Sequence, residues 1–191
     1  MLVIPVGAAG GFSATLLPRC MLLLPLLATV GITFGPFLKP IFAPMEVAAL
    51  KNTWRRDVCI QSTLSSCGPA STATVLRALG AEVGEGELAK EAHTYVGGTE
   101  AWYLARAIRS RGLGARFVMN GGGFNEAIRF PAIVGVTVNG RGHFIAVLSR
   151  TGDVYEIGDP MVGPEKRTRV ALEQRYGFTG FAIEVSREGR E

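Results

Sequence analysis

The chain is poor in the residues that build metal sites and disulfide frameworks. Its 191 residues include only three cysteines and two histidines. The cysteines, Cys20, Cys59 and Cys67, form no CxxC pair and share no repeated spacing, so the sequence predicts neither a zinc site nor a disulfide framework. A single bridge between Cys59 and Cys67 stays open at this point, although a reducing compartment is the simpler interpretation. No cofactor and no metal ion are expected.

Charge is scarce in the first quarter of the chain and unclustered in the rest. Residues 1–50 contain only Arg19, Lys39 and Glu46 as charged residues. After residue 49 both signs are mixed, as expected for a soluble domain with one core. The net charge of +4 is scattered, and no basic stripe with interleaved aromatic residues is present. Nucleic acid is therefore not an expected partner.

Two apolar runs occupy the region of low charge. Residues 20–38 come close to the roughly 20 apolar residues that cross a bilayer, and we expect a transmembrane helix there. Residues 2–17 are shorter and contain glycines, so they are a weaker candidate for a second span. A signal peptide or an incorrectly assigned start codon is the alternative, but no A-x-A cleavage site follows the second run.

The basic residues around the second run predict its orientation. Arg19 alone precedes the run, whereas Lys39, Lys51, Arg55 and Arg56 follow it. By the positive-inside rule, the folded domain lies in the cytoplasm, anchored to a bacterial inner membrane.

The sequence divides into three parts. Residues 1–40 form the membrane region, residues 41–54 a connector, and residues 55–191 the folded domain. Pro40 and Pro44 are expected to end any helix that continues from the membrane, which leaves residues 39–58 irregular.

The folded domain is predicted to be α+β. Periodic apolar residues indicate helices over 68–79, 85–95 and 99–112, the last one capped by Thr99. Short runs rich in β-branched and aromatic residues then indicate strands, with turns at Asn139-Gly140 and Thr151-Gly152-Asp153. Helices followed by an antiparallel meander form an α+β layout. The expected strands are 115–119, 132–138, 143–149, 153–157 and 180–186, with short helices at 124–130 and 169–177.

The stretch "QSTLSSCGPAS" places a cysteine directly before a helix. Cys67 is followed by Gly68 and Pro69, and proline suits the first helical turn because its missing N–H would be unpaired there. Unpaired N–H groups and the helix macrodipole favour an anion at that end, which is a known way to activate a thiolate. The alternative interpretation is a small buried hydrophobe.

A thiolate nucleophile needs a base, and His143 is the better of the two histidines. His143 opens the strand over 143–149, whereas His93 lies on a predicted helix of mixed polarity and is interpreted as a surface residue. Asp159 follows His143 by 16 positions, the length of a strand, a hairpin and its return. That topology brings Asp159 near His143, where it could orient the imidazole, unless Asp159-Pro160 is only a turn.

Gln61 completes the set of candidate residues. It lies six residues before Cys67. A side-chain amide paired with the N–H of the nucleophile is a standard way to stabilise the oxyanion of acyl transfer. A single glutamine is more often an ordinary surface residue, so this signal gains weight only beside the others.

These motifs in this order resemble one family. Gln61, then Cys67 in "CGPAS", His143 in "HFIAV" and Asp159 in "DP" are similar to the signature of the bacteriocin-processing cysteine peptidases, family thirty-nine of the cysteine peptidases. The similarity covers roughly residues 55–185. In that family a papain-like domain cuts leader peptides after a double glycine, usually at the N-terminus of an ABC exporter.

The resemblance implies a fold and a role for each residue. The fold would be a papain-like peptidase domain, with a helical half packed on an antiparallel sheet. Cys67 would be the nucleophile, His143 the general base and then acid, Asp159 the orienting residue and Gln61 the oxyanion donor.

The chain also departs from the family pattern. No exporter membrane domain and no GxxxxGK[ST] phosphate loop follow the domain, and the apolar segment precedes it. We therefore expect a membrane-anchored cysteine peptidase that acts on a peptide or leader peptide, with a separate ABC exporter as a partner. A non-cleaving peptide-binding module associated with a transporter is one alternative, and an amide-transferring or other amidase activity is another. "GGG" at 121–123 is interpreted as a loop.

Overall fold

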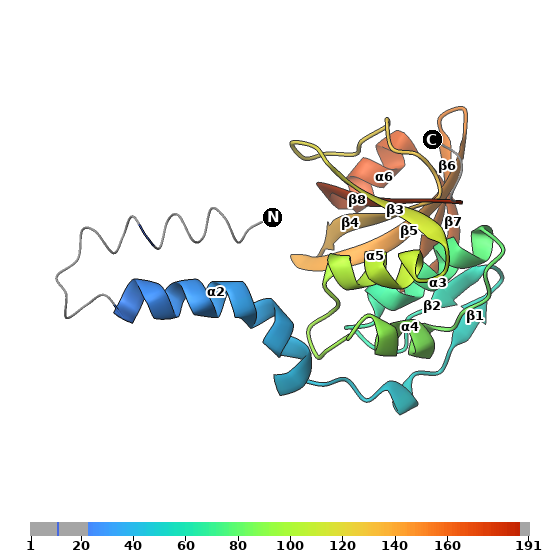
Figure 1. The fold of residues 1–191 in the computed structure, drawn as a ribbon. Coiled ribbons are helices and arrows are strands. Elements are labelled where there is room, and N and C mark those ends of the chain that lie inside the picture. The colour runs from blue at the N-terminus through green and yellow to red at the C-terminus, as the bar shows by residue number, and fades with distance from the viewer. Residues whose placement is uncertain (1–10, 12–22, 188–191) are drawn as a thin grey trace. The chain divides into compact units, whose positions relative to one another are not determined.

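The computed structural model describes residue 11 and residues 23–187 (Figure 1). Cys20, residues 20–22 of the expected span and, apart from Gly11, the candidate segment 2–17 lie outside the described residues. The chain forms two compact units, residues 1–44 and 45–191, and each is described by itself.

The first unit contains the apolar helix α2 (Leu23–Phe42). Its 20 residues are long and apolar enough to cross a membrane, a property that signal sequences share. Pro36 and Pro40 lie inside the helix, so the expectation that Pro40 ends it is wrong. A proline removes one N–H donor and bends a helix without necessarily ending it. Figure 1 shows such a bend toward the C-terminal end of α2.

The second unit is an α+β domain, as predicted. Its helices match the predicted segments closely, and both predicted hairpin turns join neighbouring strands. The helical elements are η2 (Val47–Ala49), α3 (Cys67–Ala78), α4 (Glu85–Glu91), α5 (Ala101–Arg109) and α6 (Arg169–Arg175). The strands are β1 (Thr53–Arg55), β2 (Val58–Ile60), β3 (Leu113–Met119), β4 (Ala132–Val138), β5 (Arg141–Thr151), β6 (Val154–Asp159), β7 (Gly163–Thr168) and β8 (Gly177–Arg187).

The large sheet is antiparallel with the strand order β3-β8-β4-β5-β6-β7. The predicted meander is correct for β4 to β6, but the C-terminal strand β8 separates β3 from β4. On one face of the sheet, α3 packs against β5 and α5 packs against β3 (Figure 1). The other face carries a second core, which includes Leu172 of α6.

Four local expectations are wrong. Residues 124–130 form a turn instead of a helix, because the Asn125 side chain accepts a hydrogen bond from the N–H of Ala127 at 3.0 Å. Glu100, and not Thr99, precedes α5, since the Thr99 hydroxyl bonds with that of Thr94 at 2.8 Å. Strand β7 has no counterpart in the prediction. The segment expected to be irregular contains the β1–β2 hairpin.

Candidate active site

Cys67 is the first residue of α3 and is only 7% exposed. Gly68 follows it because a Cβ there would lie 3.1 Å from Leu104 Cδ1 and 3.3 Å from the Cβ of Thr99. The N–H groups of this first turn have no acceptor within the helix, and Pro69 lacks an N–H altogether. The thiol therefore lies at the positive end of a 12-residue helix.

The sheet brings His143 and Asp159 together. Strands β5 and β6 pair with Ala146 opposite Gly158, so the start of β5 lies beside the end of β6. Nε2 of His143 and Oδ1 of Asp159 are 2.9 Å apart, and both side chains are buried. The hairpin between them thus brings the two side chains within hydrogen-bonding distance, as the spacing of 16 residues predicts.

The Asp159 carboxylate has two further donors. Oδ1 accepts from the N–H of Met161 and Oδ2 accepts from the hydroxyl of Tyr176, each at 2.8 Å. Burial raises the pKa of Asp159, but the hydrogen bonds from His143, Met161 and Tyr176 outweigh it and hold the pKa below its ordinary value. The carboxylate is therefore an anion at neutral pH.

The imidazole of His143 is held in its charged form. Burial lowers its pKa, but hydrogen bonding to Asp159 and Cys67 and the charges of both groups outweigh burial and raise the pKa to about 9. Because Nε2 is occupied by Asp159, Nδ1 is the ring nitrogen left for Cys67.

Cys67 and His143 line one cavity of about 370 Å³. Neither Asp159 nor Gln61 lines it, and Asp159 contacts His143 from behind. Four of the thirteen lining residues are glycines, which carry no side chain between the backbone and the cavity. The other lining residues are Leu64, Tyr95, Gly97, Gly98, Thr99, Gly135, Val136, Gly142, Phe144, Thr179 and Phe181.

Gln61 is tied to the site through its backbone more than through its side chain. Its N–H donates to the carbonyl of Pro160 at 3.0 Å, next to Asp159. Its side-chain Nε2 donates to the carbonyl of Thr63 at 2.7 Å, and Oε1 is buried without a partner among the described residues. The structure thus brings Gln61 close to Asp159 but not into the cavity.

Glu85, a buried glutamate that no sequence pattern indicates, holds the loop before Cys67. Both oxygens of Glu85 accept from Ser62, from its N–H at 2.7 Å and from its hydroxyl at 2.6 Å. The Ser62 hydroxyl also accepts from the N–H of Lys51 at 2.8 Å. To predict the role of Glu85, one would need to know that a residue of α4 pairs with position 62. A single sequence contains no information on such pairing.

The remaining cysteine and histidine lie elsewhere. Cys59 and Cys67 are both free thiols, so the bridge that the sequence left open does not form. Burial and the nearby charge of Glu85 raise the pKa of Cys59 to about 12. His93 is exposed and packs against the ring of Tyr103 with a centroid distance of 4.9 Å, in agreement with its interpretation as a surface residue.

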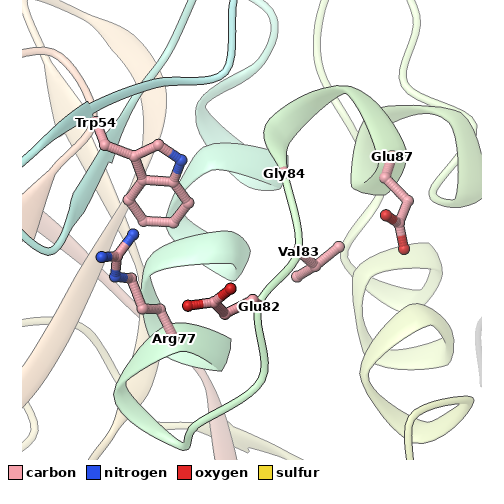
Figure 2. Close-up of a pocket in the computed structure, with 6 residues that line it drawn as sticks. All are labelled: Trp54, Arg77, Glu82, Val83, Gly84 and Glu87. Carbon is pink, nitrogen blue, oxygen red and sulfur yellow. The ribbon is translucent and has the colours of Figure 1, made fainter.

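A separate surface cavity of about 300 Å³ lies between β1, α3 and α4 (Figure 2). Figure 2 shows the guanidinium of Arg77 against the indole of Trp54, 4.6 Å from the ring centroid, with the Glu82 carboxylate pointing toward them. None of the four predicted site residues lines this cavity. Within the part of the chain that the structure describes, no group of His, Cys, Asp and Glu is arranged to hold a metal ion.

Comparison with known proteins shows the family of the chain. Residues 55–189 match the model of the Peptidase C39 family. An uncharacterized protein of Methanothermobacter marburgensis is 35% identical over 145 residues, which cover 75% of this chain and 99% of that protein. The protein named "Probable functional amyloid protease FapD" of Pseudomonas aeruginosa is 30% identical over 72% of this chain and 60% of its own length.

Solved structures share the fold. The peptidase domain of Streptococcus ComA, a bifunctional ABC transporter involved in quorum sensing, has a TM-score of 0.58 at 22% identity and covers 69% of this chain and 98% of its own. A double glycine motif protease from an AMS/PCAT transporter, solved in complex with the leader peptide, has a TM-score of 0.57 at 24% identity. It covers 68% of this chain and 90% of its own. The α+β prediction is thereby confirmed.

Proposed function

Because the chain belongs to the Peptidase C39 family, we propose that it is a membrane-anchored cysteine peptidase whose reaction is carried by Cys67, His143 and Asp159. One observation carries the proposal: His143 bonds to Asp159 at 2.9 Å while it lines the same cavity as Cys67. A thiol, an imidazole and an orienting carboxylate in this order are the parts that nucleophilic acyl transfer requires.

The proposed reaction assigns one role to each residue of the set. The Cys67 sulfur, as a thiolate beside the His143 imidazolium, attacks the carbonyl carbon of a peptide bond. Nδ1 of His143 gives its proton to the leaving amine, and an acyl-enzyme forms. The neutral imidazole then takes a proton from water, which attacks the thioester and releases the acid. Asp159 keeps Nε2 protonated throughout, so Nδ1 is the atom that exchanges protons.

The oxyanion is assigned two donors. One is the N–H of Cys67 in the first turn of α3, and the other is the second N–H of the Gln61 amide, because the first already binds Thr63. The side chain must shift toward the cavity when substrate is bound, since it does not line the cavity in the free protein.

The substrate is a peptide that is cut after two small residues, as in a leader peptide. The cavity is lined by four glycines, Gly97, Gly98, Gly135 and Gly142. Because these positions carry no side chain, the backbone of a bound peptide can approach the wall closely. The solved double glycine motif protease binds a leader peptide on the same fold. A separate ABC exporter is the partner that would use the processed peptide.

The helix α2 is the proposed membrane anchor, and the peptidase domain faces the cytoplasm. Its apolar composition supports insertion, and the basic residues that follow it support this orientation. In cells that express the full chain, the protein should remain in the membrane fraction after a carbonate wash. Protease added to sealed inverted vesicles should degrade the domain, whereas protection in such vesicles would reverse the orientation.

Peptide cleavage tests the activity itself. The full chain in detergent is incubated with a peptide library that includes leader-like peptides ending in Gly-Gly, and the products are read by mass spectrometry. We expect cleavage by the wild type, none by Cys67→Ala, and unchanged cleavage by the matched control Cys59→Ala. Binding of peptides without cleavage would favour the non-cleaving module, and transfer to an added amine in place of water would favour an amidase.

A further inference from the structure

We propose that Tyr176 is a positioning residue for this reaction: its hydroxyl fixes the Asp159 carboxylate so that Oδ1 faces the imidazole of His143. This inference rests on the proposed function, because it assigns a role to a residue behind the proposed catalytic set. Tyr176 does not line the cavity that holds Cys67, so it acts only through Asp159.

The two oxygens of Asp159 have separate partners. Oδ1 serves His143 Nε2 at 2.9 Å and the N–H of Met161 at 2.8 Å, while Oδ2 accepts from the hydroxyl of Tyr176 at 2.8 Å. A carboxylate with only the first two bonds can pivot about Oδ1. The third bond, on the opposite oxygen, removes that rotation and sets the plane in which the imidazole must lie.

The fold makes the Tyr176 hydroxyl a rigid donor. Tyr176 is 2% exposed and lies between α6 and β8, where its N–H donates to the carbonyl of Leu172 at 2.9 Å. Leu172 is itself fully buried in the core on that face of the sheet. Burial and the bond to Asp159 raise the pKa of Tyr176 well above its ordinary value, so the hydroxyl keeps its proton and remains a donor.

Four titratable groups face Asp159 from the surrounding strands and helices: His143 of β5, Glu165 of β7, Arg175 of α6 and Tyr176. Arg175 Nη2 lies 4.0 Å from Asp159 Oδ2 and 3.8 Å from Glu165, so its charge is shared between two carboxylates. Glu165 also pairs with Arg167 at 2.8 Å. Tyr176 is therefore the one group among these that makes a short hydrogen bond to Oδ2.

The kinetic test compares two buried tyrosines of the same core. Tyr155 is fully buried, but its hydroxyl has no partner among the described residues, so Tyr155→Phe is a matched control for Tyr176→Phe. With the full chain and active sites counted by thiol titration, kcat of Tyr176→Phe should fall roughly ten- to hundredfold with KM unchanged. Tyr155→Phe should keep both values.

A second measurement does not depend on activity. A hydrogen bond from Tyr176 favours the charged form of Asp159, so the stability that it adds is present above about pH 4 and is lost as pH falls through the lowered pKa of Asp159. Tyr176→Phe should therefore melt about 5 °C below wild type at pH 7, and the difference should shrink toward pH 3. Loss of packing alone would give the same difference at both pH values.

The outcomes separate the two proposals. If the wild type cleaves peptides and Tyr176→Phe keeps full kcat, or if its melting difference from wild type is the same at pH 7 and pH 3, Tyr176 is not a positioning residue, although the peptidase proposal stands. If the wild type cleaves nothing, the peptidase proposal fails, while the melting curves still report whether Tyr176 stabilises the charged Asp159.

Discussion

Cys59 and Cys67 are two free, buried thiols eight residues apart, and they lie in opposite electrostatic environments. Cys67 begins a helix, at its positive end, and lines the same cavity as an imidazole whose pKa is raised to about 9. Cys59 lies in a strand beside the Glu85 carboxylate, and burial and that charge raise its own pKa to about 12. A positive neighbourhood favours a thiolate, and a negative, desolvated one keeps the thiol protonated.

The neighbours of a cysteine decide what its thiol can do. Burial is nearly equal at the two positions, with Cys59 at 0% and Cys67 at 7% exposure. What differs is the nearby ionisable side chain, a histidine for Cys67 and a glutamate for Cys59. The same glutamate also accepts two hydrogen bonds from Ser62. One carboxylate therefore helps to keep Cys59 protonated and holds the loop before Cys67 in place.

The largest expected effect comes from replacing the Cys67 thiol, with Cys59 as the control. Cys67→Ala should reduce peptide cleavage by at least about 10⁴-fold, because Cys67 is the one thiol among the described residues that line the cavity with His143. Cys59→Ala should cleave at the wild-type rate. Turnover of a leader-like peptide measures both variants, and equal loss in both would erase the distinction between the two cysteines.

Removing the imidazole should come next. His143→Ala leaves Cys67 at the helix terminus but without its proton acceptor, so we expect kcat to fall by about 10³-fold. His93→Ala, the other histidine, is the control and should have no effect. Single-turnover cleavage measures the loss, and a small effect of His143→Ala would mean that the helix alone activates the thiol.

Gln61→Ala should have a smaller effect, a loss of roughly 10²-fold in kcat, as for one donor of an oxyanion site. Gln61→Glu, which keeps the size but replaces the N–H by an oxygen, should lose as much. Steady-state kinetics of both variants, with circular dichroism to confirm folding, gives the answer. Full activity of Gln61→Glu would exclude the amide as a donor.

The pH dependence of cleavage should show a descending limb near pH 9. The folded-state pKa of His143 is raised to about 9, so its imidazolium persists through neutral pH and is lost above that value. The stability that this charge contributes is fully present below about pH 6.5 and disappears as pH rises through 9. A kcat/KM profile from pH 5 to 10 measures the limb, and a limb near pH 6.5 would show that Asp159 does not hold the imidazolium.

The smallest change should follow Glu85→Gln. The amide can accept from Ser62 at only one of its two ends, so one bond is lost and the free energy of unfolding should fall by about 1–3 kcal/mol. Cleavage should fall only a few-fold, because Gln61 and Cys67 keep their own contacts. Urea unfolding measures the stability, and Glu87→Gln, an exposed residue of the same helix, is the control.

Much of the fold could be predicted from local patterns. The helix after Cys67, the two hairpins around β5 and the C-terminal strand carry strong periodic and turn signals in the sequence. The place of β8 between β3 and β4 could not be predicted, because strand order depends on long-range pairing. Strand β7 was missed since "GPEKRT" is polar and begins with a glycine and a proline, which are unfavourable in strands.

The candidate site divides in the same way. The spacing of His143 and Asp159 reports a single hairpin, so sequence alone could bring the two side chains together. Glu85 and Tyr176 approach the site from other parts of the chain, and their roles depend on buried hydrogen bonds that no local pattern encodes. The pairing of His143 with Asp159 was thus predictable, but the residues that hold the site in place were not.

Alkylation of the full chain by iodoacetamide, mapped to each cysteine by mass spectrometry between pH 5 and pH 9, tests the difference between the two thiols most directly. We expect Cys67 to be labelled faster than free cysteine at neutral pH, and this labelling should slow sharply in His143→Ala. Cys59 should stay unlabelled throughout. Labelling of Cys67 at the rate of free cysteine, with no effect of His143→Ala, would contradict the account.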